Sequence, residues 1–376
     1  MSSAKAIAPA LVEQGEWFMR ICNACRYCEG YCAVFPALER RLTFGEGDLN
    51  YLANLCHNCA SCYDACQYAP PHEFHLNFPR LLAEIRAETY RKYAWPDSLA
   101  ALFAKNGVAV SLITAACLAL VLATTAVLAP GFWAPHSLAE GSFYAVVPHT
   151  PIVVLFSVVG LFVVIALLTG FVRFWRDTRE PLTALAAPVT LGRAARDVLT
   201  LKNLDGGGEG CFYPEREPTL ARRRFHHITF YGFLLCFAST TIAAAYHYAL
   251  GWPAPYAFWS VPVFLGTAGG LALLVGPAGL LWLKQRRDPI LSDENQSGMD
   301  YAFVALLLLT TLSGLMLLLF REAAAVGVLL SVHLGAVLAL FLTLPYGKFA
   351  HALYRTAALV RFAIEESRPL PKYGAD

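Results

Sequence analysis

Charged side chains are scarce in this chain. Asp, Glu, Lys and Arg together make up 15% of its 376 residues, whereas hydrophobic residues make up 57%. Soluble globular proteins carry about 25% charged residues, so this composition excludes an ordinary soluble enzyme. The formal net charge is only +2, which gives no reason to expect nucleic acid as a partner.

Signatures of substrate chemistry are also missing. The chain has no Ser, His and Asp in the order typical of hydrolases and no paired catalytic carboxylates. Its glycine-rich stretch 204–211 lacks the Gly-Lys-Ser/Thr ending of a phosphate-binding loop and does not join a strand to a helix. We therefore expect no catalytic residues and no nucleotide site in this chain.

An export signal is absent as well, because the N-terminus has no charged n-region followed by an apolar h-region. We expect the cysteines to stay in a reducing compartment, where disulfides are rare and thiols bind metal. The chain has 11 cysteines, and most of them belong to two arrays near the N-terminus.

Both arrays follow the pattern C-x2-C-x2-C-x3-C, the spacing that wraps thiolates around a cubane iron–sulfur cluster. The first array comprises Cys22, Cys25, Cys28 and Cys32, and the second comprises Cys56, Cys59, Cys62 and Cys66. In two-cluster proteins the fourth cysteine of each run ligates the other cluster. We therefore predict two [4Fe-4S] clusters, one held by Cys22, Cys25, Cys28 and Cys66 and the other by Cys56, Cys59, Cys62 and Cys32.

Structural zinc is the alternative for these thiols, because paired C-x2-C units also hold zinc ions. Zinc sites normally separate two close pairs by a long spacer, whereas each array here packs four cysteines into eleven residues. A redox-inactive membrane protein with a zinc-binding head is the competing hypothesis from another functional class. Cys117, Cys211 and Cys236 lie outside the arrays, and we expect them to be packing residues.

Residues 1–105 hold both arrays and ordinary amounts of charge, which indicates a soluble head. Helical spacing over 38–55 and 78–93, without a convincing alternating strand, favours a helical ferredoxin-like domain. Residues 106–350 contain six apolar runs near the roughly 20 residues that a membrane-spanning helix needs. The expected spans are Asn106–Ala129, Pro148–Val172, His226–Leu250, Phe258–Leu283, Asp300–Phe320 and Val326–Pro345.

The predicted fold class is therefore all-α: an N-terminal helical two-cluster ferredoxin-like domain followed by a six-helix transmembrane cytochrome-b-like bundle. We expect a loop at about 173–225 between the second and third spans, and a C-terminal tail at 351–376. A loop of this length is more often functional than idle, so we expect it to dock the head or a partner enzyme.

The distribution of basic residues indicates which side of the membrane the head occupies. The segments 130–147 and 251–257 contain no Lys or Arg, and the turn after the fifth span holds only Arg321. The other connections carry the basic clusters, which are Arg91, Lys92 and Lys105; Arg173, Arg176, Arg179, Arg193, Arg222, Arg223 and Arg224; and Lys284, Arg286 and Arg287. Lys and Arg concentrate on the cytoplasmic side of short loops, so we expect the head and both termini to be cytoplasmic.

Histidines near the ends of the spans are candidate haem ligands, because ionisable side chains in a membrane are costly and usually functional. On unbroken helices, His226 and His247 share one face with a rise of about 31 Å, and His333 and His351 share one face about 27 Å apart. Matched depth predicts an inner pair, His226 with His351, and an outer pair, His247 with His333. The number of b-type haems, one or two, stays open, because Pro345 can kink the last helix and because His227 and His149 are possible substitutes.

Three separated segments, taken in order, resemble the tricarballylate/citrate utilisation protein B family. They are LCHNCASCYDACQYAPPHEF at 55–74, GGGEGC at 206–211 and RFHHITFYGFLLCFAST at 224–240. The resemblance implies a bacterial inner-membrane protein with two [4Fe-4S] clusters and haem. It further implies that the chain takes electrons from the reduced flavin of a partner dehydrogenase and passes them to the membrane.

These observations predict an electron-transfer component of an oxidoreductase system rather than a substrate-specific enzyme. Electrons would leave the flavin of an FAD-dependent dehydrogenase, pass the clusters and haem, and reach quinone in the lipid bilayer. The alternative reverses the flow: a quinol-oxidising cytochrome b anchor that feeds a cytoplasmic reductase. Cysteine spacing does not distinguish these directions.

Overall fold

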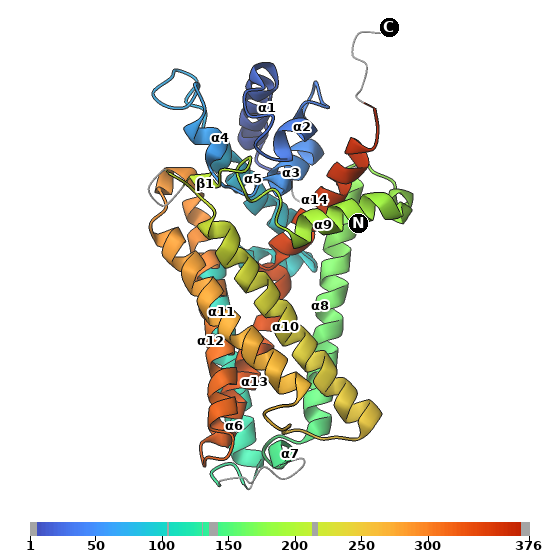
Figure 1. Ribbon diagram of the computed structural model, residues 1–376, viewed down its shortest axis with the longest axis vertical. Helices are drawn as coiled ribbons and strands as arrows, with labels where there is room; N and C mark the ends of the chain where they lie inside the picture. Colours follow the sequence, from blue (N-terminus) through green and yellow to red (C-terminus); the bar gives the residue numbers. More distant parts are fainter. Residues whose placement is uncertain (1–5, 104, 130, 135–141, 213–216, 370–376) are drawn as a thin grey trace.

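A computed structural model of the chain describes residues 6–103, 105–129, 131–134, 142–212 and 217–369. The expected loop segment 130–147 and the end of the expected tail, 370–376, therefore lie partly outside the described residues. Helices dominate, and they form a head at one end of a long bundle (Figure 1). The prediction of an all-α fold is confirmed.

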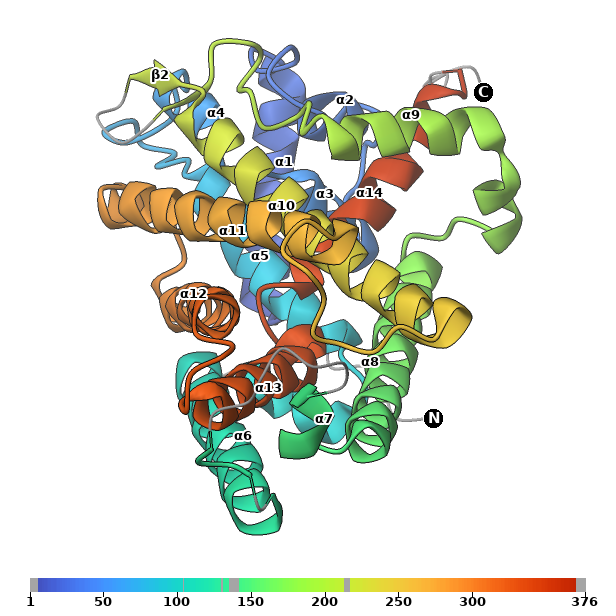
Figure 2. The ribbon, with the colours of Figure 1, turned by 60° about the horizontal axis from the view of Figure 1, so that its bottom comes forward.

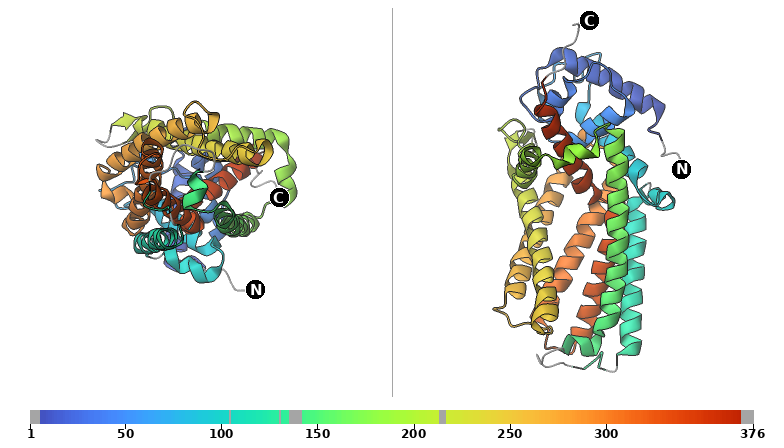
Figure 3. Two further views of the ribbon diagram at one scale, coloured as in Figure 1. Left: turned by 90° about the horizontal axis from the view of Figure 1, so that it is seen from below. Right: turned by 90° about the vertical axis from the view of Figure 1, so that its right-hand side faces the viewer.

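Among the described residues, six helices are long and apolar enough to cross a membrane, as predicted. They are α6 (Asn106–Leu128), α8 (His149–Asp177), α10 (Ala221–Leu250), α11 (Val261–Gln285), α12 (Ser297–Leu319) and α13 (Val326–Thr343). Figure 3 shows them running side by side along the long axis, with the head at one end. The chain is a multi-pass membrane protein.

Small residues let α10 and α11 pack closely. A Cβ atom added to Gly232 would lie 3.1 Å from the carbonyl oxygen of Gly269, and one added to Gly269 would lie 2.8 Å from that of Gly232. Glycine at such contacts is typical of helix pairs in membranes, where close backbone approach supplies the packing energy. Helix α11 continues through Pro277. The two helices form one hairpin that stands beside α12 (Figure 2).

The last span does not continue to the C-terminus as one helix. Helix α13 ends at Thr343, a 3-10 turn η5 (Leu344–Tyr346) contains Pro345, and α14 begins at Ala350. The expectation that His333 and His351 share one face of an unbroken helix is therefore wrong. Proline cannot donate the backbone hydrogen bond that the helix needs at this point.

The head contains short helices around the cysteine arrays. They are α1 (Pro9–Cys25), α2 (Val34–Leu38), α3 (Glu46–Leu55), α4 (Ser61–Asp64) and α5 (Phe78–Tyr93), followed by the 3-10 helix η1 (Asp97–Phe103). The helix expected over 78–93 is present, whereas that expected over 38–55 begins only at Glu46. Asp48 explains the late start, because its side chain accepts a hydrogen bond from the backbone of Gly45 and so caps the helix.

Residues expected as a C-terminal tail include a helix that completes the head. Helix α14 (Ala350–Glu366) buries Tyr354, Leu359 and Phe362 in the same hydrophobic core as Tyr51 and Tyr90. The carboxylate of Glu365 accepts a hydrogen bond of 3.0 Å from the Tyr51 hydroxyl.

The connection between α8 and α10 is partly structured. It contains the 3-10 helix η2 (Leu182–Ala186), helix α9 (Pro188–Leu199), and the antiparallel strands β1 (Cys211–Phe212) and β2 (Pro218–Thr219), which pair Cys211 with Thr219. Helix α9 lies across the junction between head and bundle and packs against α14 (Figure 1). The other short elements are α7 (Ser142–Val146), η3 (Pro289–Leu291) and η4 (Glu294–Gln296).

The end of α8 fixes the head to the bundle. Asp177 accepts hydrogen bonds from the Lys92 ammonium at 2.5 Å and from the Tyr93 hydroxyl at 2.7 Å. A Cβ atom on Gly47 would lie 2.3 Å from the carbonyl oxygen of Asp177, so only glycine permits this approach. The head and the bundle thus share both polar and close backbone contacts.

We expect Glu365→Ala to destabilise the attachment of α14 to the head. Glu365 pairs with the guanidinium groups of Arg41 and Arg361, and its removal leaves Asp48 as their remaining carboxylate, so we expect a cost of about 1.5–3 kcal/mol. The control is Glu16→Ala, which removes an exposed pair with Arg20 worth about 0.3–0.5 kcal/mol. Denaturant unfolding in detergent, followed by tryptophan fluorescence, measures the free energy of unfolding of both variants. Equal losses of stability in Glu365→Ala and Glu16→Ala would contradict the expectation.

Candidate metal centres

The eight array thiols gather around two neighbouring cavities in the head. The first cavity, of about 250 Å³, is lined by Cys22, Cys25, Cys28 and Cys66, together with Cys62. The second, of about 10 Å³, is lined by Cys32, Cys56, Cys59 and Cys62. These are the two groups that the spacing predicts. Their role as cluster ligands stays a prediction.

Left-handed backbone conformations turn the cysteines of each array toward a common point. Arg26, Asn58 and Ala60 have φ angles of 56°, 55° and 70°, and each lies between two successive array cysteines. Such conformations are uncommon outside glycine. They end α1 after Cys25 and fold residues 56–62 into a tight loop, which explains how cysteines two residues apart reach one cavity.

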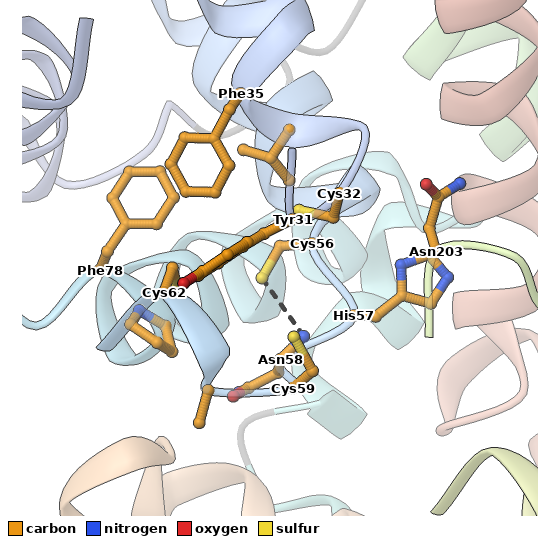
Figure 4. Close-up of a pocket in the computed structure, with 13 residues that line it drawn as sticks. Tyr31, Cys32, Phe35, Cys56, His57, Asn58, Cys59, Cys62, Phe78 and Asn203 are labelled. Atoms are coloured by element: carbon orange, nitrogen blue, oxygen red, sulfur yellow. Dashed lines mark hydrogen bonds between the residues drawn. The ribbon is translucent and has the colours of Figure 1, made fainter. Parts of the chain in front are cut away.

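Hydrogen-bond donors surround the sulfur atoms of the second site. The backbone N–H of Asn58 donates to Cys56 Sγ at 3.3 Å (Figure 4), and the Ser61 hydroxyl donates to Cys59 Sγ at 3.4 Å. At the first site, the Gln67 amide lies 3.8 Å from Cys25 Sγ. Donors directed at sulfur stabilise the thiolate, which is the form that binds metal.

The two sites differ in electrostatics. Burial and the neighbouring thiols Cys66 and Cys25 raise the pKa of Cys28 to about 12. The pKa of Cys59 is instead lowered, to about 6, by a hydrogen bond from Cys211 and further by Ser61 and the charge of Arg222. Burial raises the pKa of Cys32 and Cys62 at the second site well above the usual range, so the preference for negative charge there belongs to Cys59.

The glycine-rich segment 206–212 covers the second site. Cys211 is 1% exposed and packs in one hydrophobic cluster with Cys59, and the N–H of Phe212 donates to the carbonyl of Cys59 at 3.2 Å. Gly206 has a φ of 58°, and a Cβ atom there would lie 2.4 Å from Ser61 Oγ, so glycine is required. The interhelical loop thus docks on the head, one of the two roles expected from its length.

Arginines from the membrane helices reach the same loop. Arg222, at the start of α10, donates to the carbonyl of Asn58 at 2.8 Å. Arg287, just after α11, donates to the side-chain oxygen of Asn58. The second array is therefore bonded directly to the bundle, whereas the first array lies farther from it.

Among the described residues, no three His, Cys, Asp or Glu side chains are arranged around a single metal ion. Zinc requires four donors within about 2.3 Å of one point, whereas the thiols of a cubane bind separate iron atoms. The thiols thus do not form a ready-made zinc site.

The structure brings the predicted inner histidine pair together. The rings of His226 on α10 and His351 on α14 have centroids 6.1 Å apart and are nearly perpendicular. A metal–imidazole bond is about 2 Å long, so two rings that share one metal have centres about 6 Å apart. Nδ1 of His351 hydrogen-bonds to the carbonyl of Lys348, and Nδ1 of His226 has no hydrogen-bond partner among the residues that the structure describes.

The outer histidines are arranged differently from the predicted pair. His247 stacks on His149, with centroids 4.2 Å apart, while Nδ1 of His333 lies 3.2 Å from Ser313 Oγ and 3.2 Å from the carbonyl of Thr310 on α12. The stacked rings are too close to share a metal. His227 lies beside Tyr231 of its own helix, with centroids 5.9 Å apart.

His57 is a residue that sequence reasoning missed. It lies between Cys56 and Cys59, is 5% exposed, and hydrogen-bonds through Nδ1 to the carbonyl of Leu55 at 2.9 Å. Burial and the charges of Arg355 and Arg222 lower its pKa well below the usual range, so it is neutral. Its position inside the array was the available signal. His57 lines the second cavity and also has His226 as an electrostatic neighbour.

Comparison with known proteins gives a consistent result. A family profile described as citrate utilization protein B matches residues 103–372, and one described as its Fer4-like domain matches residues 16–92. The chain is 52% identical over 356 residues to citrate utilization protein B of Escherichia coli, and the match covers 94% of this chain and 92% of that protein. No solved structure matches the chain.

Iron content distinguishes ligands from packing cysteines. We expect Cys59→Ala to lose about half of the bound iron, because it removes one of the four thiols of the second site. Cys211→Ala is the matched control, since it removes a buried thiol that touches Cys59 without belonging to an array. Iron and acid-labile sulfide, measured per chain after anaerobic purification, test both variants. Iron loss in Cys211→Ala would instead make Cys211 a ligand.

Proposed function

Because the chain belongs to the citrate utilization protein B family, we propose that it is a membrane-bound electron-transfer protein. It reoxidises the reduced flavin of an FAD-dependent dehydrogenase of the tricarballylate/citrate-utilisation type and delivers the electrons to the membrane quinone pool. The observation that carries this proposal is that eight thiols gather around two cavities in the head and that the rings of His226 and His351 meet 6.1 Å apart.

The thiol sites are proposed to hold two [4Fe-4S] clusters. Cys22, Cys25, Cys28 and Cys66 are the ligands of the first, and Cys56, Cys59, Cys62 and Cys32 are the ligands of the second. When bound, such clusters and b-type haem take up and release one electron at a time. The donors at Asn58, Ser61 and Gln67 are directed at sulfur and support this assignment.

One b-type haem is proposed, with His226 and His351 as its axial ligands. The centroid distance of 6.1 Å suits two imidazoles that share a metal, and the carbonyl of Lys348 fixes the ring of His351 through Nδ1, leaving Nε2 for the metal. Helix α10 packs chiefly against α11, so the face that carries His226 has little protein packed on it. The rings of His149 and His247 stack with centroids 4.2 Å apart, which is too close for both imidazoles to bind one metal.

The bacterial inner membrane is the proposed location, with the head and both termini in the cytoplasm. The basic clusters of the sequence lie at the head end of the helices, including Arg173 and Arg176 of α8, Arg222 of α10 and Lys284 of α11. This distribution is the one that the positive-inside rule predicts for a cytoplasmic face. The dehydrogenase would then meet the head from the cytoplasm.

Flavin reoxidation tests the function directly. Anaerobic vesicles that contain the chain and a quinone should reoxidise the reduced dehydrogenase, and Cys59→Ala should slow this at least 100-fold because it interrupts the path. Cys236→Ala is the control, since this thiol lies on α10 outside both thiol cavities. Flavin absorbance in a stopped-flow instrument measures the rate. An unchanged rate in Cys59→Ala would reject the proposed path.

Haem absorbance tests the proposed ligands. We expect His351→Ala to lose the Soret band of bound haem while the iron–sulfur absorbance is retained. His333→Ala is the matched control, because its ring is held by Ser313 and Thr310 on α12, and it should keep a full haem complement. Haem loss in His333→Ala would show that the outer histidines bind haem, and full haem in His351→Ala would refute the inner pair.

A further inference from the structure

Two arginines donate hydrogen bonds to the same carbonyl of the second cysteine array. Arg86, from α5, donates to the carbonyl oxygens of Cys56 at 2.8 Å and Ala53 at 2.9 Å. Arg355, from α14, donates to Cys56 at 2.8 Å and to Asn54 at 3.3 Å. These contacts place two guanidinium charges immediately beside the second thiol site.

No carboxylate compensates these charges. In the part of the chain that the structure describes, neither Arg86 nor Arg355 forms an ion pair with Asp or Glu. Arg86 is 6% exposed. Arg355 is half-buried, and because arginine stays protonated in proteins both side chains carry a positive charge.

A buried cation without a partner costs several kcal/mol, so this arrangement is expected only beside an anion. A [4Fe-4S] cubane held by four thiolates is such an anion, and it gains one further negative charge on reduction. Cations at short range favour the more negative state. Arg86 and Arg355 therefore stabilise the reduced form of whatever cluster occupies the second site.

The first site has no comparable charges. No charged side chain lines either cavity, so the difference between the sites lies in the arginines that bond to the backbone of Cys56. The basic residue beside the first site, Arg26, is exposed, and its Nε donates to the carbonyl of Asn23 at 3.3 Å. An exposed charge is screened by water and salt, so it affects a cluster much less than Arg86 and Arg355 do.

The two sites also differ in what can approach them. Tyr27, which lines the first cavity, is 69% exposed, so a partner can reach this site from outside. The second site is covered by the loop of Cys211 and faces His57, whose charged and ring neighbours include Arg355, Arg222 and His226. The first site thus faces solvent, and the second faces the bundle.

We propose that the second site holds the cluster of higher reduction potential, set by Arg86 and Arg355, and that the first site accepts electrons from the partner flavoprotein. This inference rests on the proposed function and gives it a direction. With clusters bound, the thiols of the first site would hold the one that accepts an electron from the flavin, and those of the second site would hold the one that receives it next. Arg86 and Arg355 would compensate the negative charge that the second cluster gains, and the first cluster would lose the same electron.

The order of the potentials can be measured with one cluster at a time. Cys25→Ala should retain only the second cluster, and Cys59→Ala only the first. Redox titration of each purified protein, followed by electron paramagnetic resonance, should give a higher midpoint potential for the cluster retained in Cys25→Ala. The reverse order would overturn the proposal without any further variant.

The role of the arginines is tested in the otherwise native chain. Arg355→Gln keeps hydrogen-bond donors but removes the positive charge. It should lower the midpoint potential of the second cluster only. We expect the electron equilibrium between the two clusters to shift at least tenfold, which is about 59 mV for a one-electron couple. Arg355→Lys, which keeps the charge, should shift it less. Arg26→Gln is the control beside the first site and should change neither potential by this amount.

The outcomes separate this inference from the proposed function. If the native protein shows no cluster signal, the proposed function fails. If both clusters are present but Arg355→Gln shifts neither midpoint, or shifts both equally, only the inference fails. Where Arg355→Gln does not assemble its clusters, Arg86→Gln and the single-cluster proteins give the answer.

Discussion

Hydrogen bonds from arginine side chains to one short stretch of backbone connect the head, the bundle and the C-terminal helix. The carbonyls of residues 53–58 accept from Arg86 of α5, Arg222 of α10 and Arg355 of α14. Burying a guanidinium group without an anion is costly, and this applies most to Arg86, which is 6% exposed. The second cysteine array is therefore the point where the head, the bundle and the C-terminal helix meet.

Helix α10 links this centre to the membrane. Near the head His226 meets His351 of α14, and near the other end of the helix His247 meets His149 of α8. Between these contacts the helix depends on close glycine packing against α11. Because α11 holds α10 along one side, the other faces of α10 can carry histidines that contact neighbouring helices. Cofactor sites in helix bundles are built from such side chains on facing helices.

Much of the architecture was predictable because its signals are local. The six spans follow from apolar runs of sufficient length, and they occur where the sequence predicted them, within a few residues. The thiol groups gather as the spacing predicts, since each array folds over a few residues. The late start of α3 and the break before α14 were harder to predict from the sequence. The first depends on the cap at Asp48, and the second on Pro345 in the turn between α13 and α14.

The sequence by itself determined the kind of protein: eight thiols in two regular arrays, six apolar helices, and basic residues at one end. Only the tertiary structure decided that Cys211 lies against Cys59, that His247 lies against His149, and that Arg86 and Arg355 share the carbonyl of Cys56. Each of these contacts joins residues far apart in the chain. Periodicity and spacing report which face of one element a residue occupies, whereas helix packing determines which other element that face meets.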